Sequence, residues 1–303
     1  MEYHKPVMLQ ECLDGLRINP SGVYVDTTFG GGGHSRAILD QLGSDGRLVA
    51  FDQDADALSN VVADGRLVVY NENFRHLKNF LRLGGIRRID GLLADLGVSS
   101  HQFDTAERGF SFRTDAPLDL RMDRRQSQTA ADVVNSYDEA ELRRVLALYG
   151  ELPQAGAMAR RLCELRMENP IDTTQALCSA VERFLPRGRE NKYLAMLFQA
   201  LRIEVNGELE ALQQMLLQAV ELLNPGGRLV VISYHSLEDR LVKNLFRSGN
   251  FEGLVEKDFY GNVLSPLRPV VRKAMVPTAE EVADNNRARS AKLRIAEKVE
   301  EKE

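Results

Sequence analysis

The sequence has few cysteines and no long hydrophobic run. Its apolar stretches, of which Leu194–Leu201 is among the longest, stay well short of the ~18 residues that a membrane-spanning helix needs. The first residues show no apolar signal-peptide core, so we expect a cytoplasmic protein with no membrane association. Cys12, Cys163 and Cys178 form no C-x-x-C pair. This pattern argues against a cysteine-based zinc site, favours a reducing compartment, and leads us to expect no metal.

Charge is nearly balanced but unevenly distributed. The 303 residues include 39 basic and 44 acidic side chains, giving a net charge of −5, with 44% hydrophobic residues. This composition excludes collagen-like and wholly disordered chains. A mildly acidic protein is not a general nucleic-acid binder, yet Arg287, Arg289, Lys292 and Arg294 follow one another with no acid between them. Such a local basic surface can still bind a phosphate backbone.

Short apolar runs alternate with helical patterns through the first hundred residues. Strands are expected at Val23–Val25, Leu48–Phe51, Leu67–Tyr70 and Gly91–Leu93, with helices at Ser35–Leu42, Asp56–Val62 and Phe74–Leu83. The alternation predicts a parallel, doubly wound α/β sheet.

The alternation of strands and helices then stops. The next convincing strand, Leu229–Ile232, begins 134 positions after Asp95, whereas a crossover needs only about a dozen residues. The intervening pattern is helical and includes one long stretch, Tyr193–Leu223. We therefore predict a Rossmann-like doubly wound sheet in residues 1–114 and 208–303, with an all-helical subdomain inserted at 115–207. The tail Pro269–Ile295 can supply one or two final strands.

A glycine loop follows the first expected strand. Gly30–Gly33 come four residues after Asp26, and Asp52 stands 22 residues after Gly30 at the end of the second strand. Consecutive glycines are costly in conformational entropy and suit a close backbone approach to a ligand. A carboxylate at the position of Asp52 suits the hydroxyls of an adenosine ribose. Together these features predict a site for an adenosine-containing ligand.

The loop does not match the common nucleotide fingerprints. Ser35 stands where a nicotinamide-binding loop has its third glycine, and no G-K-[ST] follows. The acid Asp26 would repel a pyrophosphate but attract the ammonium and sulfonium groups of S-adenosylmethionine. That molecule is therefore the favoured cofactor, and a dehydrogenase is disfavoured.

Several separate motifs, in one order along most of the chain, resemble the MraW, or RsmH, family of S-adenosylmethionine-dependent small-subunit rRNA methyltransferases. They are residues 4–9, Asp26–Ser35, Asp95–Ser100, Arg108–Phe112, Pro117–Asp123, Phe198–Leu209, Pro225–Arg240 and Asn286–Leu293. The resemblance implies methylation of the N4 amine of a cytidine in the decoding region. It also implies a cofactor site formed by Gly32, Gly33, His34, Asp52, Phe74, Asp95 and Gln102.

Asp95 is the candidate catalytic residue. It ends the fourth expected strand, at the edge where ligands bind in open α/β sheets. The exocyclic amine of cytosine is a poor nucleophile, because its lone pair is delocalised into the ring. An acceptor that takes a hydrogen bond from this amine helps to localise the pair, so we expect Asp95 to orient it. The alternatives are cofactor binding alone, a helix cap or a solvated acid.

The candidate substrate-binding residues lie outside the glycine loop: Phe110, Phe112, Arg113, Tyr234, His235, Arg287 and Arg289. Aromatic and guanidinium planes commonly stack on splayed RNA bases, but Phe110 and Phe112 are equally well interpreted as anchors of their loop. Ser236 with Asp239 suggests a helix cap, which leaves Tyr234 and His235 to face the base. His4 is a candidate for closing the site, although a lone histidine is more often structural.

The expected partner is small-subunit rRNA within an assembled or nearly assembled small ribosomal subunit, because a protein of charge −5 would bind naked RNA weakly. Two rival functions remain open, a small-molecule methyltransferase and a non-catalytic RNA-binding adaptor that retains the pocket. The sequence leaves the oligomeric state open, a homodimer included.

Overall fold

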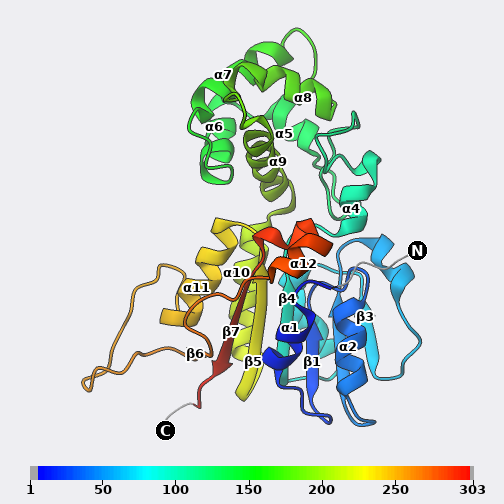
Figure 1. Ribbon diagram of the computed structural model, residues 1–303, viewed down its shortest axis with the longest axis vertical. Helices are drawn as coiled ribbons and strands as arrows, with labels where there is room; N and C mark the ends of the chain where they lie inside the picture. The colour runs from blue at the N-terminus through cyan, green and yellow to red at the C-terminus, as the bar shows by residue number, and fades with distance from the viewer. Residues whose placement is uncertain (1–5, 301–303) are drawn as a thin grey trace. The chain divides into compact units, whose positions relative to one another are not determined.

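The computed structural model describes residues 6–300, and the chain divides into two compact units (Figure 1). One unit contains the residues up to Gly97 together with those from Leu209 onward, and it holds a seven-stranded sheet. The other unit, Val98–Glu208, is helical. The helical unit thus includes residues 98–114, which the sequence pattern assigns to the sheet domain. His4 lies outside the described residues.

The strands lie in the order β3-β2-β1-β4-β5-β7-β6. Their bounds are β1 Val23–Asp26, β2 Arg47–Phe51, β3 Leu67–Tyr70, β4 Ile89–Asp95, β5 Leu223–Ser233, β6 Leu267–Pro269 and β7 Lys292–Lys298. The first five strands are parallel, whereas β7 pairs antiparallel with both β5 and β6. This confirms the doubly wound α/β sheet, and the tail supplies its last two strands.

Helices cover both faces of this sheet because the central strands are apolar on both sides. Leu92 and Val231 pack in one core with α3 (Leu77–Leu83), α10 (Glu208–Leu222) and α11 (Ser236–Ser248). Their neighbours Leu93 and Val230 pack in a second core with α1 (Leu9–Leu16) and α2 (Gly33–Gln41). Successive side chains of a strand point to opposite faces, so the uninterrupted apolar runs predict this two-sided burial.

The helical unit has its own apolar core. Its elements are α4 Ser100–Asp104, η3 Ala106–Arg108, α5 Ala130–Ser136, α6 Glu139–Leu148, α7 Ala155–Arg166, α8 Thr174–Val181, η4 Glu182–Phe184 and α9 Glu190–Asn206. Thr129 and Asp138 begin α5 and α6 with reciprocal capping boxes. Gly207, with φ +57°, ends α9, so the helical stretch Tyr193–Leu223 consists of α9 and of α10, the crossover helix that leads back to the sheet.

Two local expectations differ from the structure. The segment expected as a helix at 56–62 forms only a 3-10 turn, η1 (Ala55–Asn60), capped by the Asp54 side chain. Asp, Ser and Asn side chains compete for backbone hydrogen bonds, and only Ala57 of this turn is buried. The segment after β3 begins with a second 3-10 turn, η2 (Phe74–His76), before α3.

Within residues 6–300, no helix has both the length and the apolar character to cross a membrane.

Candidate active site

Three acids gather at the carboxyl edge of adjacent strands. Asp26 ends β1 and Asp95 ends β4, while Asp52 directly follows β2. These strands are parallel neighbours, and Asp26 is in register with Ala50 of β2 and with Leu93 of β4. The sheet therefore brings together three carboxylates that are far apart in the sequence, at the edge where open α/β sheets bind ligands.

The glycine loop folds tightly over this edge. Gly32 has φ +73° and precedes α2, a conformation that L side chains rarely adopt. A Cβ added to Gly33 would lie 2.3 Å from Cγ of Pro6, so a methyl group has no room there. The backbone N–H of Gly30 donates to Oδ2 of Asp52 at 2.7 Å. The loop is thus fixed against the strand that follows it in the sheet.

Asp52 keeps acceptor capacity beyond its bonds within the loop. Its Oδ1 accepts the N–H of Asp54 at 2.9 Å, and its Oδ2 accepts Gly30. A carboxylate offers about four acceptor positions, so these two bonds leave room for ligand hydroxyls. Burial raises the pKa of Asp52 from 3.8 to about 6, the two N–H bonds lower it, and the charges of Asp54 and Asp26 raise it further.

Asp26 and Ser35 are hydrogen-bonded to each other. Asp26 is 1% exposed and accepts the Ser35 hydroxyl at 2.7 Å and the N–H of Thr28 at 3.1 Å. Ser35 therefore stands in place of a third glycine because its hydroxyl links the first turn of α2 to the end of β1. These bonds show that Asp26 holds the loop, while its expected attraction for a cationic ligand stays a prediction. Its charge still adds to the acidic character of this edge.

Asp95 contacts two side chains from other parts of the sheet unit. Its Oδ1 accepts the hydroxyl of Tyr234 at 2.7 Å, and its Oδ2 lies 3.9 Å from Nδ1 of His34. Burial raises the pKa of Asp95 from 3.8 to about 6. His34 and the Tyr234 bond act in the opposite direction, while Asp26 and Glu238 raise the pKa further. The Asp95 backbone N–H donates to Oγ1 of Thr28, which ties the strand end to the loop.

His34 has a defined orientation. Its Nε2 lies 3.1 Å from the carbonyl oxygen of Val7, and the side chain is buried. A carbonyl only accepts, so Nε2 carries a hydrogen and Nδ1 faces Asp95. Nδ1 of His34 and Oδ2 of Asp95 are 3.9 Å apart, which is too far for a direct hydrogen bond.

Tyr234 and His235 follow β5, but they serve different neighbours. Tyr234 packs its ring against Gly97 and donates to Asp95, and its pKa is raised well above its usual value by burial and then by the Asp95 charge. His235 begins α11 by accepting the N–H of Glu238, with Nε2 3.2 Å from the same side chain. The helix cap thus lies one residue before the expected Ser236.

The other candidates occupy separate surroundings. Phe74 starts η2 and is half-buried against the core of the sheet unit. Gln102 belongs to the helical unit, where it is 4% exposed and forms a capping box with Ser99. Phe110 is 5% exposed in the helical core, and Phe112 packs its ring on Phe198. These placements favour the loop-anchor alternative for both phenylalanines.

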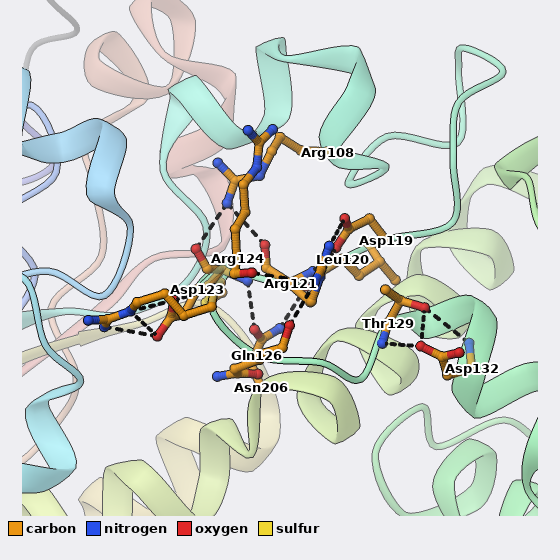
Figure 2. A network of polar contacts seen from close by, with 12 residues as sticks. Arg108, Asp119, Leu120, Arg121, Asp123, Arg124, Gln126, Thr129, Asp132 and Asn206 are labelled. Carbon is orange, nitrogen blue, oxygen red and sulfur yellow. Dashed lines mark hydrogen bonds and ion pairs between the residues drawn. The ribbon is translucent and has the colours of Figure 1, made fainter.

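A polar network that the sequence did not predict joins Arg108 and Asn206 to the backbone of residues 120–122 (Figure 2). The side chain of Arg113, earlier in the same loop, is exposed. Arg108 is 1% exposed and donates to the carbonyl oxygens of Arg121 and Met122. Asn206 accepts the N–H of Met122 at 2.7 Å and donates to Leu120, whose φ is +61°.

Acids from other elements partly neutralise the basic tail. Arg294 and Lys292 of β7 pair with Asp239 at 2.7 and 3.3 Å, and Arg268 pairs with Glu297. Arg287 and Arg289 lie on η5 (Asn286–Ser290), after α12 (Ala279–Asp284), and both are exposed. Of Arg287, Arg289, Lys292 and Arg294, the two exposed guanidinium groups therefore lie on η5.

The model of the MraW methylase family matches residues 1–299 of the chain. The chain belongs to the MraW methylase family. Proteins named ribosomal RNA small subunit methyltransferase H support this: the one from Parabacteroides distasonis is 58% identical over 98% of both chains, and the one from Flavobacterium johnsoniae is 56% identical over 99% of both. Among solved structures, an rRNA methylase from Streptococcus thermophilus covers 99% of both chains at 11% identity, with a TM-score of only 0.44. Methyltransferases of the MraW family use S-adenosylmethionine.

Proposed function

We propose that the protein transfers a methyl group from S-adenosylmethionine to the N4 amine of a cytidine in small-subunit rRNA, in the decoding region. Full-length identity above half to proteins named small-subunit rRNA methyltransferases supports the substrate class. The observation that carries the chemistry is Asp95, held at the sheet edge by Tyr234 with its second oxygen facing His34. Because bacterial rRNA is cytoplasmic, we place the activity in the cytoplasm.

The residues at the sheet edge fit this cofactor. S-adenosylmethionine supplies an electrophilic methyl group on a positively charged sulfur. Buried Asp26 and half-buried Asp52 and Asp95 provide a negative environment for a cation, and Asp52 retains acceptor positions for ribose hydroxyls. The glycine loop closes against Asp52 through the Gly30 N–H bond. We assign Gly32, Gly33, His34, Asp52, Phe74 and Asp95 of the sheet unit to this site. The role of Gln102, which belongs to the helical unit, stays a prediction from the family resemblance.

Asp95 has the properties that the amine requires. Methylation of N4 replaces one N–H bond by an N–C bond, so one proton must leave the nitrogen. Tyr234 occupies Oδ1, which leaves Oδ2 to accept a hydrogen bond from the amine and then the proton. A carboxyl with pKa about 6 is ionised at neutral pH, so Asp95 is in the form that accepts a proton.

The substrate-recognition residues are proposals of the same kind. We assign RNA contacts to exposed Arg113 and to Arg287 and Arg289 on η5, because exposed guanidinium groups bind phosphates. The helical unit, with 115–207 as its predicted extent, is the proposed platform for this recognition. The substrate is proposed to be an assembled or nearly assembled small subunit, since a net charge of −5 disfavours naked RNA.

Nucleoside analysis tests the proposal. Small subunits and protein-free rRNA from a strain lacking the activity are incubated with labelled cofactor and then digested for mass spectrometry. We expect N4-methylcytidine from wild-type protein and none from Asp95→Ala. A methyl group on another nucleoside, or undiminished transfer by Asp95→Ala, would overturn the chemistry. Transfer to small molecules without RNA would favour the rival methyltransferase.

A further inference from the structure

A long hairpin follows α11 and extends away from the helices and strands of the sheet unit (Figure 1). It spans residues 250–266, with an antiparallel bridge between Lys257 and Val263. Its exposed apolar residues are Leu254 (67%), Val255 (40%), Phe259 (99%), Tyr260 (86%), Val263 (46%) and Leu264 (55%). Single exposed apolar residues, such as Leu83 on α3, are ordinary, but a contiguous group marks an interaction surface.

Hydrogen bonds preform the tip of this hairpin. Asp258 accepts the backbone N–H groups of Tyr260 and Asn262 at 2.9 and 2.8 Å, and also the side-chain amide of Asn262. The backbone N–H of Leu264 donates to the carbonyl of Glu256 at 2.8 Å. Phe259 and Tyr260 meet edge to face, with ring centroids 5.7 Å apart. The two aromatic rings are thus presented on a built turn, which lowers the entropy lost on binding.

The base of the hairpin is tied to the sheet unit. Oδ1 of Asn250 accepts the backbone N–H groups of Gly253 and Leu254, and the Asn244 side chain of α11 donates to the carbonyl of Phe251. Phe251 packs against the core of the sheet unit. Because the base of the hairpin is attached to α11 and to the core, a partner that binds the tip is held to the sheet unit.

Charge decides which partner suits the hairpin. Residues 250–266 contain the acids Glu252, Glu256 and Asp258 against one base, Lys257, and no arginine. A phosphate backbone is repelled by this net negative charge. Aromatic anchors with an acidic surround instead complement an apolar pocket with a basic rim on a protein.

We propose that this hairpin docks on a basic protein surface of the small ribosomal subunit, with Phe259 and Tyr260 as the anchors. The proposal rests on the proposed function, because it takes the substrate to be a subunit that carries proteins. The hairpin would then select assembled subunits over protein-free rRNA, without taking part in methyl transfer.

Binding measurements with two substrates test this. Phe259→Ser with Tyr260→Ser is compared with wild type and with the control Leu83→Ser, which removes another exposed apolar side chain. We expect the double variant to bind intact small subunits about tenfold more weakly, and protein-free small-subunit rRNA unchanged. Equal weakening on both would show that the rings stack on RNA, and no weakening on either would also overturn the proposal.

A charge reversal gives a second readout that does not depend on the aromatic pair. Glu256→Lys should weaken binding to intact subunits if the partner is a basic protein, and should strengthen it if the partner is RNA. Sedimentation velocity of the free proteins tests whether the hairpin instead binds a second copy of this chain. Self-association of the wild-type protein that is lost in the double variant would show this and overturn the proposal. Nucleoside analysis of the wild-type reaction separately reports failure of the proposed methylation.

Discussion

Replacing Tyr234 with phenylalanine should move the acidic limb of the pH–rate profile to higher pH. The change removes the hydroxyl that donates to Oδ1 of Asp95 at 2.7 Å, while the ring can stay against Gly97. A hydrogen bond to a carboxylate favours its ionised form, so losing the bond raises the pKa of Asp95. Since Asp95 acts as the ionised acceptor, activity falls as pH drops through that pKa.

The size of the pKa shift follows from the strength of the Tyr234–Asp95 hydrogen bond. Hydrogen bonds to charged groups contribute about 1.5–3 kcal/mol, and one pKa unit corresponds to about 1.4 kcal/mol. Some of this is recovered by water or by His34, so we expect a rise of about one unit from the value of about 6. The midpoint of the acidic limb should thus move from about pH 6 to about pH 7, with little change in rate on the alkaline side.

Initial rates of labelled methyl transfer, measured between about pH 5 and about pH 9, test this shift. Tyr260→Phe, which removes a hydroxyl from an exposed ring, is the matched control. The chain has 8 tyrosines and no tryptophan, so near-ultraviolet titration gives an independent readout: the variant should lose a phenol that ionises well above the ordinary pKa. An acidic limb that stays in place, or moves to lower pH, would refute the reasoning.

Three further predictions concern the loop, the ribose acceptor and the helical core. Gly33→Ala should abolish measurable cofactor binding in calorimetry, because a methyl group would lie 2.3 Å from a proline ring carbon, whereas Gly65→Ala, with nothing within 4 Å, should bind normally. Asp52→Asn should weaken cofactor affinity by about tenfold, with circular dichroism unchanged; equal affinity would remove it from the site. Asn206→Ala should lower the free energy of unfolding by about 2–5 kcal/mol, because the N–H of Met122 and the carbonyl of Leu120 both lose their hydrogen-bond partner. Denaturant titration measures this loss, and Asn79→Ala, at an exposed position, should leave the free energy of unfolding unchanged.

The parallel sheet was predictable because its strands are apolar on both faces and end in acids. Once the strands are parallel, Asp52 and Asp95 must meet at one edge, whatever lies between them in the sequence. The 3-10 turn η1 was predicted wrongly as a helix, because a polar segment with one buried residue has no packing to extend it. Local pattern thus specifies elements best where a core supports them.

The partners of the acids could not be predicted. Tyr234 meets Asp95 across 139 positions only because β5 lies beside β4, and the order of strands is a tertiary property. Ser35 looked like a departure from a glycine fingerprint until the structure showed it bonded to Asp26. The position of a residue at the end of a strand predicts that it reaches the carboxyl edge of the sheet. The order of the strands decides which of these side chains contact one another.

The residues just before α1 form part of the wall of the cofactor loop. The Pro6 ring fills the space beside Gly33, the Val7 carbonyl orients His34, and the backbone N–H of Met8 donates to Glu281. A substitution at Pro6 would therefore open space beside the glycine loop, and a displaced Val7 carbonyl would release the imidazole that faces Asp95. Loss of turnover in such a variant would arise from a segment that holds none of the reacting groups.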